Sequence, residues 1–554
     1  MKPTVIRVHE ADATLREAPR FRLKRDGAWA DVTWGDCDAA FAEVGVWLAQ
    51  AGLSREQAVC VFAPNRVEWL YAGFGIQAAG GAMVPIYPSN TAEQAGYVIR
   101  HSDAFAVFVD TQPLLERVLV SGAVSPTLRL VLLGEGHDLD AAEAAAVGAG
   151  VSLPEAWRAN VTTLPALRAE GRAKLDAEPG TYDALLDQIR REHRCLMLYT
   201  SGTTGNPKGV PLTYENVNSS SEDWIETLGK QIPEEPVDLF WLPMSHIFGW
   251  GEASLGFELE FLSYLTNPAE VLGLFDSIRP SVFMSVPAYW EKLARGAMAE
   301  TDPEKRKARL RADTGGRLHF CLSGGAGLER KVKEAFEEAG LLIIEGYGLT
   351  EASPTITMNQ PDRYRFDSVG LPFPRVQLKL AEDGEILVKG PNVFSGYHKD
   401  PEATAKTFDA DGWLLTGDLG RLTEDGFLQI IGRKKEILVT AGGKNVPPAN
   451  IENLFVNDDL IEHLVVYGDG KKYLVAGVWV TEKGKKMAPD ALDAEVTARI
   501  EAANGRLAKH ETIKKHRIIE APLTVEGGML TPTLKLRRKN VYGAFGNQLE
   551  ELYA

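Results

Sequence analysis

The chain alternates short apolar runs with longer segments in which apolar residues recur every three or four positions, as in strands followed by helices. Strands joined through helices predict a parallel sheet with helices on both faces. Asn65, just past the first predicted strand, is a candidate N-cap for the next helix. The predicted strands lie at 58–62, 83–86, 106–109, 128–133 and 196–199.

The pattern changes near Gly432. Short strands at 464–467, 473–480 and 517–519 accompany one amphipathic helix at about 492–507, which is the size of a small α+β domain. The sequence therefore predicts an α/β protein with a large multi-sheet N-terminal domain, residues 1–434, and a small α+β C-terminal domain, residues 435–554.

Composition is that of an ordinary globular protein. Of 554 residues, 45% are apolar and 25% charged, and 60 basic against 76 acidic residues give a net charge of −16. So acidic a chain argues against general nucleic-acid binding. The segment from Glu436 onward holds 16 basic and 16 acidic residues, so the excess negative charge belongs to the larger domain.

Cysteine use and hydropathy favour a reduced cytoplasmic protein. Cys37, Cys60, Cys195 and Cys321 form no CxxC motif, so neither a metal site nor a redox pair is expected. The uncharged stretch 69–88 contains four glycines, Gln77 and Pro85, and predicts a helix, a Gly-Gly break and a strand rather than a membrane span. The N-terminus has no apolar signal core.

A segment of phosphate-binding composition follows the strand at 196–199. It reads Thr-Ser-Gly-Thr-Thr-Gly-Asn-Pro-Lys-Gly over 200–209. Glycines let backbone N–H groups approach an anion, hydroxyls donate further hydrogen bonds, and Lys208 adds charge. Because Lys208 lies between prolines 207 and 211, no helix can start there, which distinguishes the segment from a Walker loop.

Together with six further motifs in order, this loop resembles the signatures of the adenylate-forming superfamily, which includes acyl-CoA synthetases, luciferases and peptide-synthetase adenylation domains. The resemblance spans nearly the whole chain. The further motifs are WLPMSHIFG at 241–249, SGGAGL at 323–328, EGYGLTEASP at 345–354, DGWLLTGDLG at 411–420, GRKKEILVTAGGKNVPPANIE at 432–452 and LTPTLKLRR at 530–538.

The resemblance implies an ATP site assembled from several motifs. Gly324, Gly325 and Ala326 would form the adenine wall, with Tyr347 stacking on the base beside Gly348. Asp418 would accept hydrogen bonds from the ribose diol. Arg433 would contact the ribose and the phosphates. The residues implied for the phosphate loop are Thr200, Ser201, Gly202, Thr203, Thr204 and Lys208.

The resemblance also implies catalytic roles and a mobile C-terminal domain. Glu351 would bind magnesium and Thr350 the α-phosphate, while Lys535 would stabilise the adenylation transition state. Lys435 matches the hinge about which the small domain rotates between two half-reactions. The turn at 441–443, formed by Ala441, Gly442 and Gly443, would then line a tunnel for the pantetheine of coenzyme A.

The acyl pocket is predicted from His246 and Trp250. Trp250 occupies the position at which long-chain synthetases carry a tryptophan gate, whereas a role in core packing is the alternative for both side chains. No acidic residue lies between Ser245 and Gly251 to pair with the ammonium group of an amino acid. The pattern favours a neutral acyl group.

We therefore expect an AMP-forming ligase that joins a medium- or long-chain fatty acid to coenzyme A, with ATP and magnesium as cofactors. Two alternatives stay open: an acyl- or aryl-AMP ligase that loads a carrier protein, and a non-catalytic acyl or nucleotide binder. The partners expected are small molecules and no nucleic acid. The sequence leaves peripheral membrane contact and a homodimer open.

Overall fold

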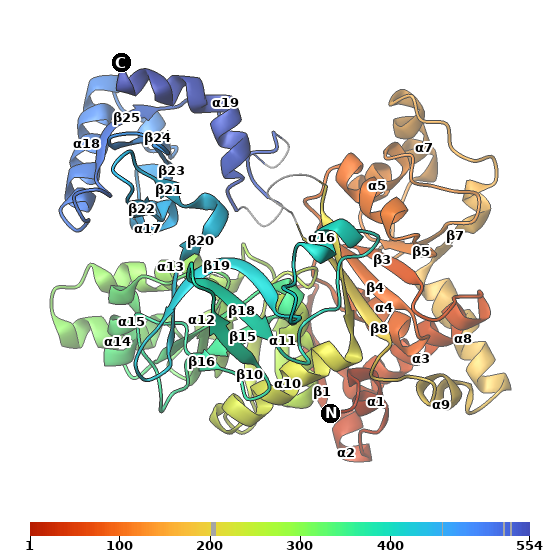
Figure 1. Ribbon diagram of the computed structural model, residues 1–554. Helices are drawn as coiled ribbons and strands as arrows, with labels where there is room; N and C mark the ends of the chain where they lie inside the picture. The colour runs from red at the N-terminus through yellow and green to blue at the C-terminus, as the bar shows by residue number, and fades with distance from the viewer. Residues whose placement is uncertain (201–205, 457, 525–526, 532–534) are drawn as a thin grey trace.

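The computed structural model describes residues 1–200, 206–456, 458–524, 527–531 and 535–554. A large N-terminal domain holds most of the sheets, and a small C-terminal domain, blue in Figure 1, lies against one side of it. The predicted fold class is confirmed. Among the described residues, no helix is long and apolar enough to cross a membrane.

One sheet of the large domain carries the predicted alternation of strands and helices. Neighbouring strands pair in parallel except at the last hairpin, where β8 and β9 are antiparallel. The strand order is β7 (Val161–Thr163), β6 (Arg129–Leu132), β5 (Ala106–Val109), β3 (Ala58–Phe62), β4 (Ala82–Ile86), β8 (Arg194–Thr200) and β9 (Lys208–Thr213).

Both faces of this sheet are apolar because helices cover both. Val59 and Val61 of β3 join one hydrophobic core, whereas Cys60 and Phe62 point into another. The first core includes residues of α3 (Trp34–Gln50) and α4 (Val67–Ala78), and the second includes residues of α5 (Ala92–His101), α6 (Gln112–Val120) and α7 (Leu139–Gly148). The four cysteines are free and buried, as their apolar neighbours indicate.

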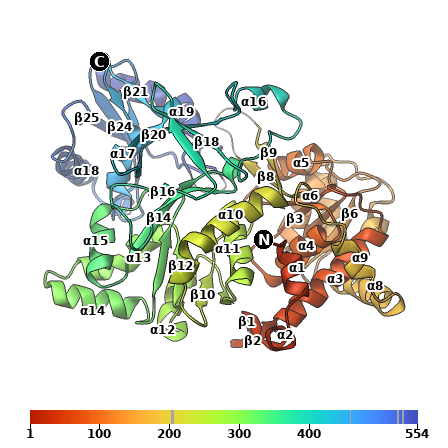
Figure 2. The same ribbon diagram turned by 60° about the horizontal axis from the view of Figure 1, so that its bottom comes forward.

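The second sheet crosses the middle of the large domain. Parallel strands form its centre, and antiparallel pairs close both ends. The order is β16 (Leu371–Pro372), β15 (Thr355–Met358), β14 (Ile343–Gly348), β13 (Phe320–Ser323), β12 (Val282–Ser285), β10 (Val237–Phe240), β11 (Leu262–Leu265), β1 (Pro19–Arg25) and β2 (Ala28–Thr33). Helices flanking it include α10 (Tyr214–Leu228), α11 (Ile247–Glu258), α13 (Pro287–Met298), α14 (Pro303–Asp313) and α15 (Arg330–Glu338) (Figure 2).

An antiparallel sheet leads from the large domain toward the small one. It consists of β17 (Gln377–Leu380), β18 (Glu385–Lys389), β19 (Leu414–Leu422) and β20 (Leu428–Arg433). The small domain then packs β23 (Ile461–Tyr467), β24 (Leu474–Val480) and β25 (Ile513–Ile518) against α18 (Pro489–Asn504) and α19 (Arg538–Glu550), with a short hairpin of β21 (Leu438–Val439) and β22 (Asn445–Val446).

Two sequence expectations need correction. The amphipathic helix of the small domain begins at Pro489 and ends at Asn504, about three residues earlier than its apolar periodicity indicates. Asn65 does not cap α4, because Arg66 occupies the N-cap position and makes no side-chain cap. The Asn65 amide instead bonds to the segment that follows β10.

Candidate active site

Asp418 is the centre of a polar cluster on the antiparallel sheet. It lies directly opposite Arg433 in the register of β19 and β20, and its Oδ1 is 2.9 Å from Arg433 Nε. Its Oδ2 accepts a 2.7 Å hydrogen bond from the hydroxyl of Tyr347, at the end of β14. Three residues predicted from separate motifs therefore meet at one carboxylate.

Burial and charge keep the hydroxyl of Tyr347 protonated. Desolvation and the negative charge of Asp418 raise the pKa of Tyr347, so its hydroxyl stays protonated and donates. The carboxylate itself is buried, yet it is held by a cation and a donor. Tyr347 and Arg433 keep contact with solvent, so a nucleotide could approach this cluster from the open side.

The adenine wall predicted at 324–326 follows β13. Gly325 has φ +83° and Gly324 lies under the ring of Phe248, where a Cβ would stand 3.2 Å from Phe248 Cε1. Gly325 and Ala326 are exposed. Glycine is needed at 325 for the backbone conformation of the turn, and at 324 for the close approach of the Phe248 ring.

Glu345 holds the loop that contains the predicted adenine wall, residues 324–326, in place. Its Oε1 accepts a 2.7 Å hydrogen bond from the backbone N–H of Leu328, and its Oε2 is paired with the buried ammonium of Lys333. Desolvation raises the pKa of the Glu345 carboxyl, while Lys333 opposes that shift. Glu345 stands in the EGYGLTE motif without having been predicted as functional, because a buried acid cannot be told from an exposed one by motif alone.

Glu351 and Lys208 are joined by a tyrosine that sequence reasoning missed. The hydroxyl of Tyr397 donates 2.8 Å to Glu351 Oε1, and Lys208 Nζ lies 4.7 Å from the centroid of the Tyr397 ring. Glu351 and Thr350 belong to a short 3₁₀ helix, Thr350–Ala352, which is separated from Gly348 by Leu349 alone. Gly348 allows this turn, because a Cβ there would be 1.9 Å from the carbonyl oxygen of Pro354.

The predicted phosphate loop connects the antiparallel strands β8 and β9. Thr200 pairs with Lys208 across that hairpin, so the two ends of the loop are held together. The absence of a helix after Lys208 agrees with the prediction. Ser201, Gly202, Thr203 and Thr204 lie outside the described residues.

Lys535 reaches the large domain from the small one. Its Nζ lies 3.5 Å from the carbonyl oxygen of Gly325, the long limit of a hydrogen bond. The side chain keeps contact with solvent, yet desolvation between the domains and the nearby charge of Arg433 lower its pKa, while Asp418 acts in the opposite direction. The lysine therefore contacts the predicted adenine wall and lies within electrostatic range of Arg433 and Asp418.

His246 lies two residues before Phe248, whose ring packs on Gly324, and it is within electrostatic range of Lys535. Its Nδ1 accepts a 3.1 Å hydrogen bond from the N–H of Phe248 and caps α11, so a neutral ring carries its proton on Nε2. Desolvation, and to a lesser extent Lys535, lower the pKa of His246 to about 4. The ring is therefore neutral at pH 7 and borders the site as an uncharged donor.

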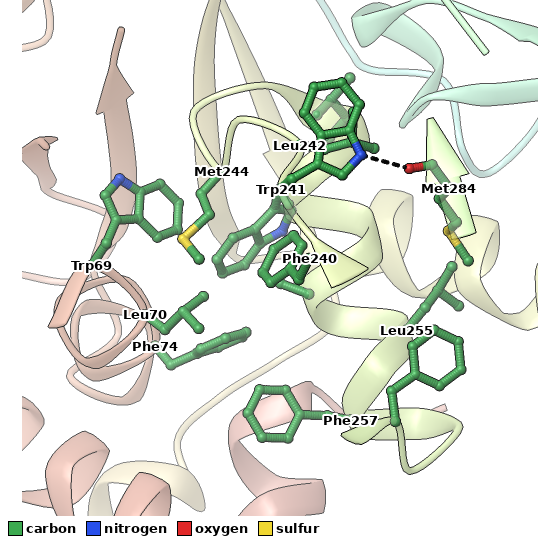
Figure 3. Close-up of a cluster of buried hydrophobic side chains, with 14 of the residues drawn as sticks. Trp69, Leu70, Phe74, Phe240, Trp241, Leu242, Met244, Leu255, Phe257 and Met284 are labelled. Atoms are coloured by element: carbon green, nitrogen blue, oxygen red, sulfur yellow. Dashed lines mark hydrogen bonds between the residues drawn. The ribbon is translucent and has the colours of Figure 1, made fainter. Parts of the chain in front are cut away.

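Trp250 lies one turn further along α11 and is buried against α4. Its ring centroid is 4.7 Å from that of Phe74 and 5.8 Å from that of Trp69. Figure 3 shows Trp69, Leu70 and Phe74 of α4 turned toward the segment that carries Phe240 and Met244. The indole N–H of Trp250 has no hydrogen-bond partner among the described residues. Its gating role stays a prediction.

The predicted hinge and tunnel residues lie near the join of the two domains. Lys435 is exposed in a short 3₁₀ helix, Lys434–Glu436, that follows β20 directly. Ala441, Gly442 and Gly443 form the exposed turn between β21 and β22, where Gly443 has φ +69°. The hinge and tunnel roles of these residues stay predictions.

Comparison with known proteins gives the family. A model of the AMP-binding enzyme family matches residues 10–398, and one of the AMP-binding enzyme C-terminal domain matches residues 435–554. Long-chain-fatty-acid–CoA ligase FadD15 of Mycobacterium bovis is 32% identical over 95% of this chain and 93% of its own length. The chain belongs to the AMP-binding enzyme family, and it resembles long-chain acyl-CoA ligases.

Solved structures share the fold at lower identity. The adenylation domain of a carboxylate reductase from Mycobacterium chelonae matches with a TM-score of 0.80 and 20% identity, over 99% of this chain and 92% of its own. The corresponding domain from Segniliparus rugosus, in complex with AMP and a co-purified carboxylic acid, matches with a TM-score of 0.79 and 20% identity, over 99% and 95%.

Proposed function

We propose that this protein activates a medium- or long-chain fatty acid with ATP, releasing pyrophosphate and forming an acyl-adenylate, and then transfers the acyl group to coenzyme A with release of AMP. The observation that carries the proposal is the contact of Lys535 Nζ with the carbonyl oxygen of Gly325, at a place where the charges of Arg433 and Asp418 also act on the lysine. That arrangement places a cation from the small domain beside the groups predicted to hold a nucleotide.

The first half-reaction needs positive charge where a carboxylate attacks the α-phosphate. Arg433 and Lys535 supply that charge, while Asp418 accepts from the ribose diol and Tyr347 lies beside the base. In forming the adenylate, one oxygen of the fatty acid bonds to the α-phosphorus and the bond to pyrophosphate breaks. In the second half-reaction, the thiolate sulfur of coenzyme A bonds to the acyl carbon and AMP leaves.

The residues at Glu351 suit magnesium. A single carboxylate donor, here adjacent to Thr350, is typical of magnesium sites in which the substrate phosphates and waters complete the coordination. Tyr397 donates to Oε1, and among the described residues none donates to Oε2, which would face the ion. When bound, magnesium would neutralise phosphate charge. Glu351 would orient the ion, and Lys208 would bind the phosphates directly.

A neutral acyl group is supported by the charges along α11. Glu252, two residues after Trp250, is buried, and desolvation raises the pKa of its carboxyl well above the usual range. The cation near it is Arg20, a residue of the protein itself. The Glu252 side chain is therefore not expected to pair with the ammonium group of an amino-acid substrate.

Pyrophosphate release across a panel of acids tests the proposal. The panel runs from acetate to C18 and includes benzoate, each with and without coenzyme A. The expected profile peaks at C12–C18 and turns over only with coenzyme A. A peak at short or aryl acids would refute the fatty-acid assignment, whereas release independent of coenzyme A would indicate a carrier protein as acceptor. No release with any acid would leave the non-catalytic binder.

A further inference from the structure

Asn65 makes an unusual set of contacts for a residue between a strand and a helix. Its Nδ2 donates to the carbonyl oxygens of Trp241 at 3.2 Å and Leu242 at 2.8 Å, and its Oδ1 accepts from the N–H of Met244 at 2.9 Å. Two acceptors and one donor define the orientation of the amide. Asn65 belongs to the segment after β3, so it ties the seven-stranded sheet to a loop of the nine-stranded sheet.

The loop held by Asn65 leads directly to His246. The N–H of His246 donates 2.9 Å to the carbonyl of Pro243, which lies between Leu242 and Met244, both bonded to Asn65. Gly249 packs on the same peptide, where a Cβ would be 2.3 Å from the Pro243 oxygen. The backbone of His246 is therefore linked to the Asn65 amide through a short series of contacts along residues 242–246.

The segment that contains Asn65 also contacts the other end of residues 241–250. Trp69 and Phe74, in α4 just beyond Asn65, pack on Trp250 of α11. Residues 65–74 thus contact both ends of the segment 241–250, which holds the predicted acyl-pocket residues. On the nucleotide side, Phe248 lies on Gly324.

We propose that Asn65 is a positioning residue that holds the 241–246 loop, and with it His246, in register with Lys535 and the carboxylate of the acyl substrate. This inference rests on the proposed function, since it takes His246 as a border of the acyl pocket. Asn65 itself touches neither substrate nor nucleotide in this proposal.

The amide chemistry makes the test specific. Asn65→Asp retains shape and the acceptor but places carboxylate oxygens against two carbonyl oxygens. Asn504→Asp is the matched control, because the Asn504 amide makes a comparable pair of bonds to Ile513, within the small domain. Asn65→Ala is the second variant: it removes the contacts without adding repulsion, should the aspartate variant fail to fold.

Steady-state kinetics should separate the two substrates. With the best acid of the panel, we expect the KM for the acid to rise about tenfold or more in both Asn65 variants, while the KM for ATP stays within about twofold. Asn504→Asp should lower Tm without changing either KM. Unchanged KM values in Asn65→Ala with a lowered Tm, or an equal rise for both substrates, would overturn the inference.

A second readout is independent of the acid. Histidine-selective NMR of the intact enzyme, with the His246 signal assigned by its loss in His246→Asn, follows the titration of that ring. Release of the loop should move its midpoint from about 4 toward the ordinary value in the Asn65 variants. If the midpoint does not move, the positioning role is wrong, even where the fatty-acid profile supports the proposed function. If it moves while no acid is activated, the proposed function fails and the contact stands.

Discussion

Tyr347 and Asp418, which are 71 residues apart in sequence, share a 2.7 Å hydrogen bond in which the tyrosine hydroxyl donates to Oδ2 of the carboxylate. This bond joins the end of β14 to β19 and brings a ring predicted to lie against adenine beside a carboxylate predicted to hold ribose. Arg433 holds the other oxygen at 2.9 Å. The three residues of the predicted nucleotide site are therefore held in place by contacts with one another.

Asp418→Asn should weaken ATP binding. The substitution removes the charge that pairs with Arg433 and halves the acceptor capacity for a diol, and charge-assisted hydrogen bonds are worth about 1.5–3 kcal/mol, or about 10–100-fold in affinity. The KM for ATP in pyrophosphate exchange measures the effect. Asp425→Asn, an exposed carboxylate in the turn between β19 and β20, is the control and should leave that KM unchanged. Similar values for both variants would contradict the assignment.

Lys535→Ala should block the first half-reaction selectively. Loss of a comparable transition-state donor costs about 2.7–4 kcal/mol, which slows adenylation about 10²–10³-fold. Thioester formation from supplied acyl-adenylate should remain largely intact. Lys539→Ala, an exposed lysine of α19, provides the control. Equal loss in both half-reactions would show that Lys535 acts in another way.

Lys435→Pro should slow the thioester step much more than adenylation. Proline fixes φ and removes a backbone N–H at the residue about which the small domain is predicted to rotate. Single-turnover rates of the two half-reactions give the comparison. Lys435→Ala, which removes the side chain and leaves the backbone free, should behave as the unmodified enzyme. Equal slowing of both steps by the proline variant would rule out a hinge.

The free energy of unfolding should fall as pH drops from about 6.5 toward 4, in part through His246. The pKa of this ring is about 4 in the folded protein and near 6.5 when unfolded, so the unfolded chain binds more protons in that window. His246 contributes roughly 1–2 kcal/mol to this loss, since solvent screens part of the effect at a half-buried ring. Urea unfolding of the unmodified protein and His246→Asn at pH 7 and pH 5 measures it. An identical loss in both proteins would exclude His246.

Trp250→Ala distinguishes a gate from a core residue. Truncation of a buried tryptophan lowers the free energy of unfolding by about 3–5 kcal/mol whether or not the residue is a gate. A gate predicts, in addition, a broadened or lengthened chain-length profile in the acid panel. Trp290→Ala is the matched control, because Trp290 is fully buried on α13, away from α11. If the two variants lose stability alike and neither changes the profile, Trp250 is packing only.

Local pattern was enough for the regular elements and for the residue types of the site. The apolar run Ala58–Phe62 and its neighbours predicted buried parallel strands, because strands covered on both faces must be apolar throughout. The glycine and threonine composition of 200–209 predicted a phosphate loop without a helix, because Pro207 and Pro211 exclude one. Asp418, Arg433 and Tyr347 were predicted through a resemblance of motifs.

Tertiary structure alone decided which of these residues meet. Asn65 is a residue type that commonly caps helices. Its amide instead forms hydrogen bonds with residues 241–244, because the loops of the two sheets meet at that point. Tyr397 carries no signal in its own segment, and its role between Lys208 and Glu351 follows from contacts distant in sequence. The burial of Glu345 and the lowered pKa of His246 have the same origin. Sequence pattern determines what each segment forms, because propensity and periodicity are local, whereas desolvation and side-chain pairing depend on which segments pack together.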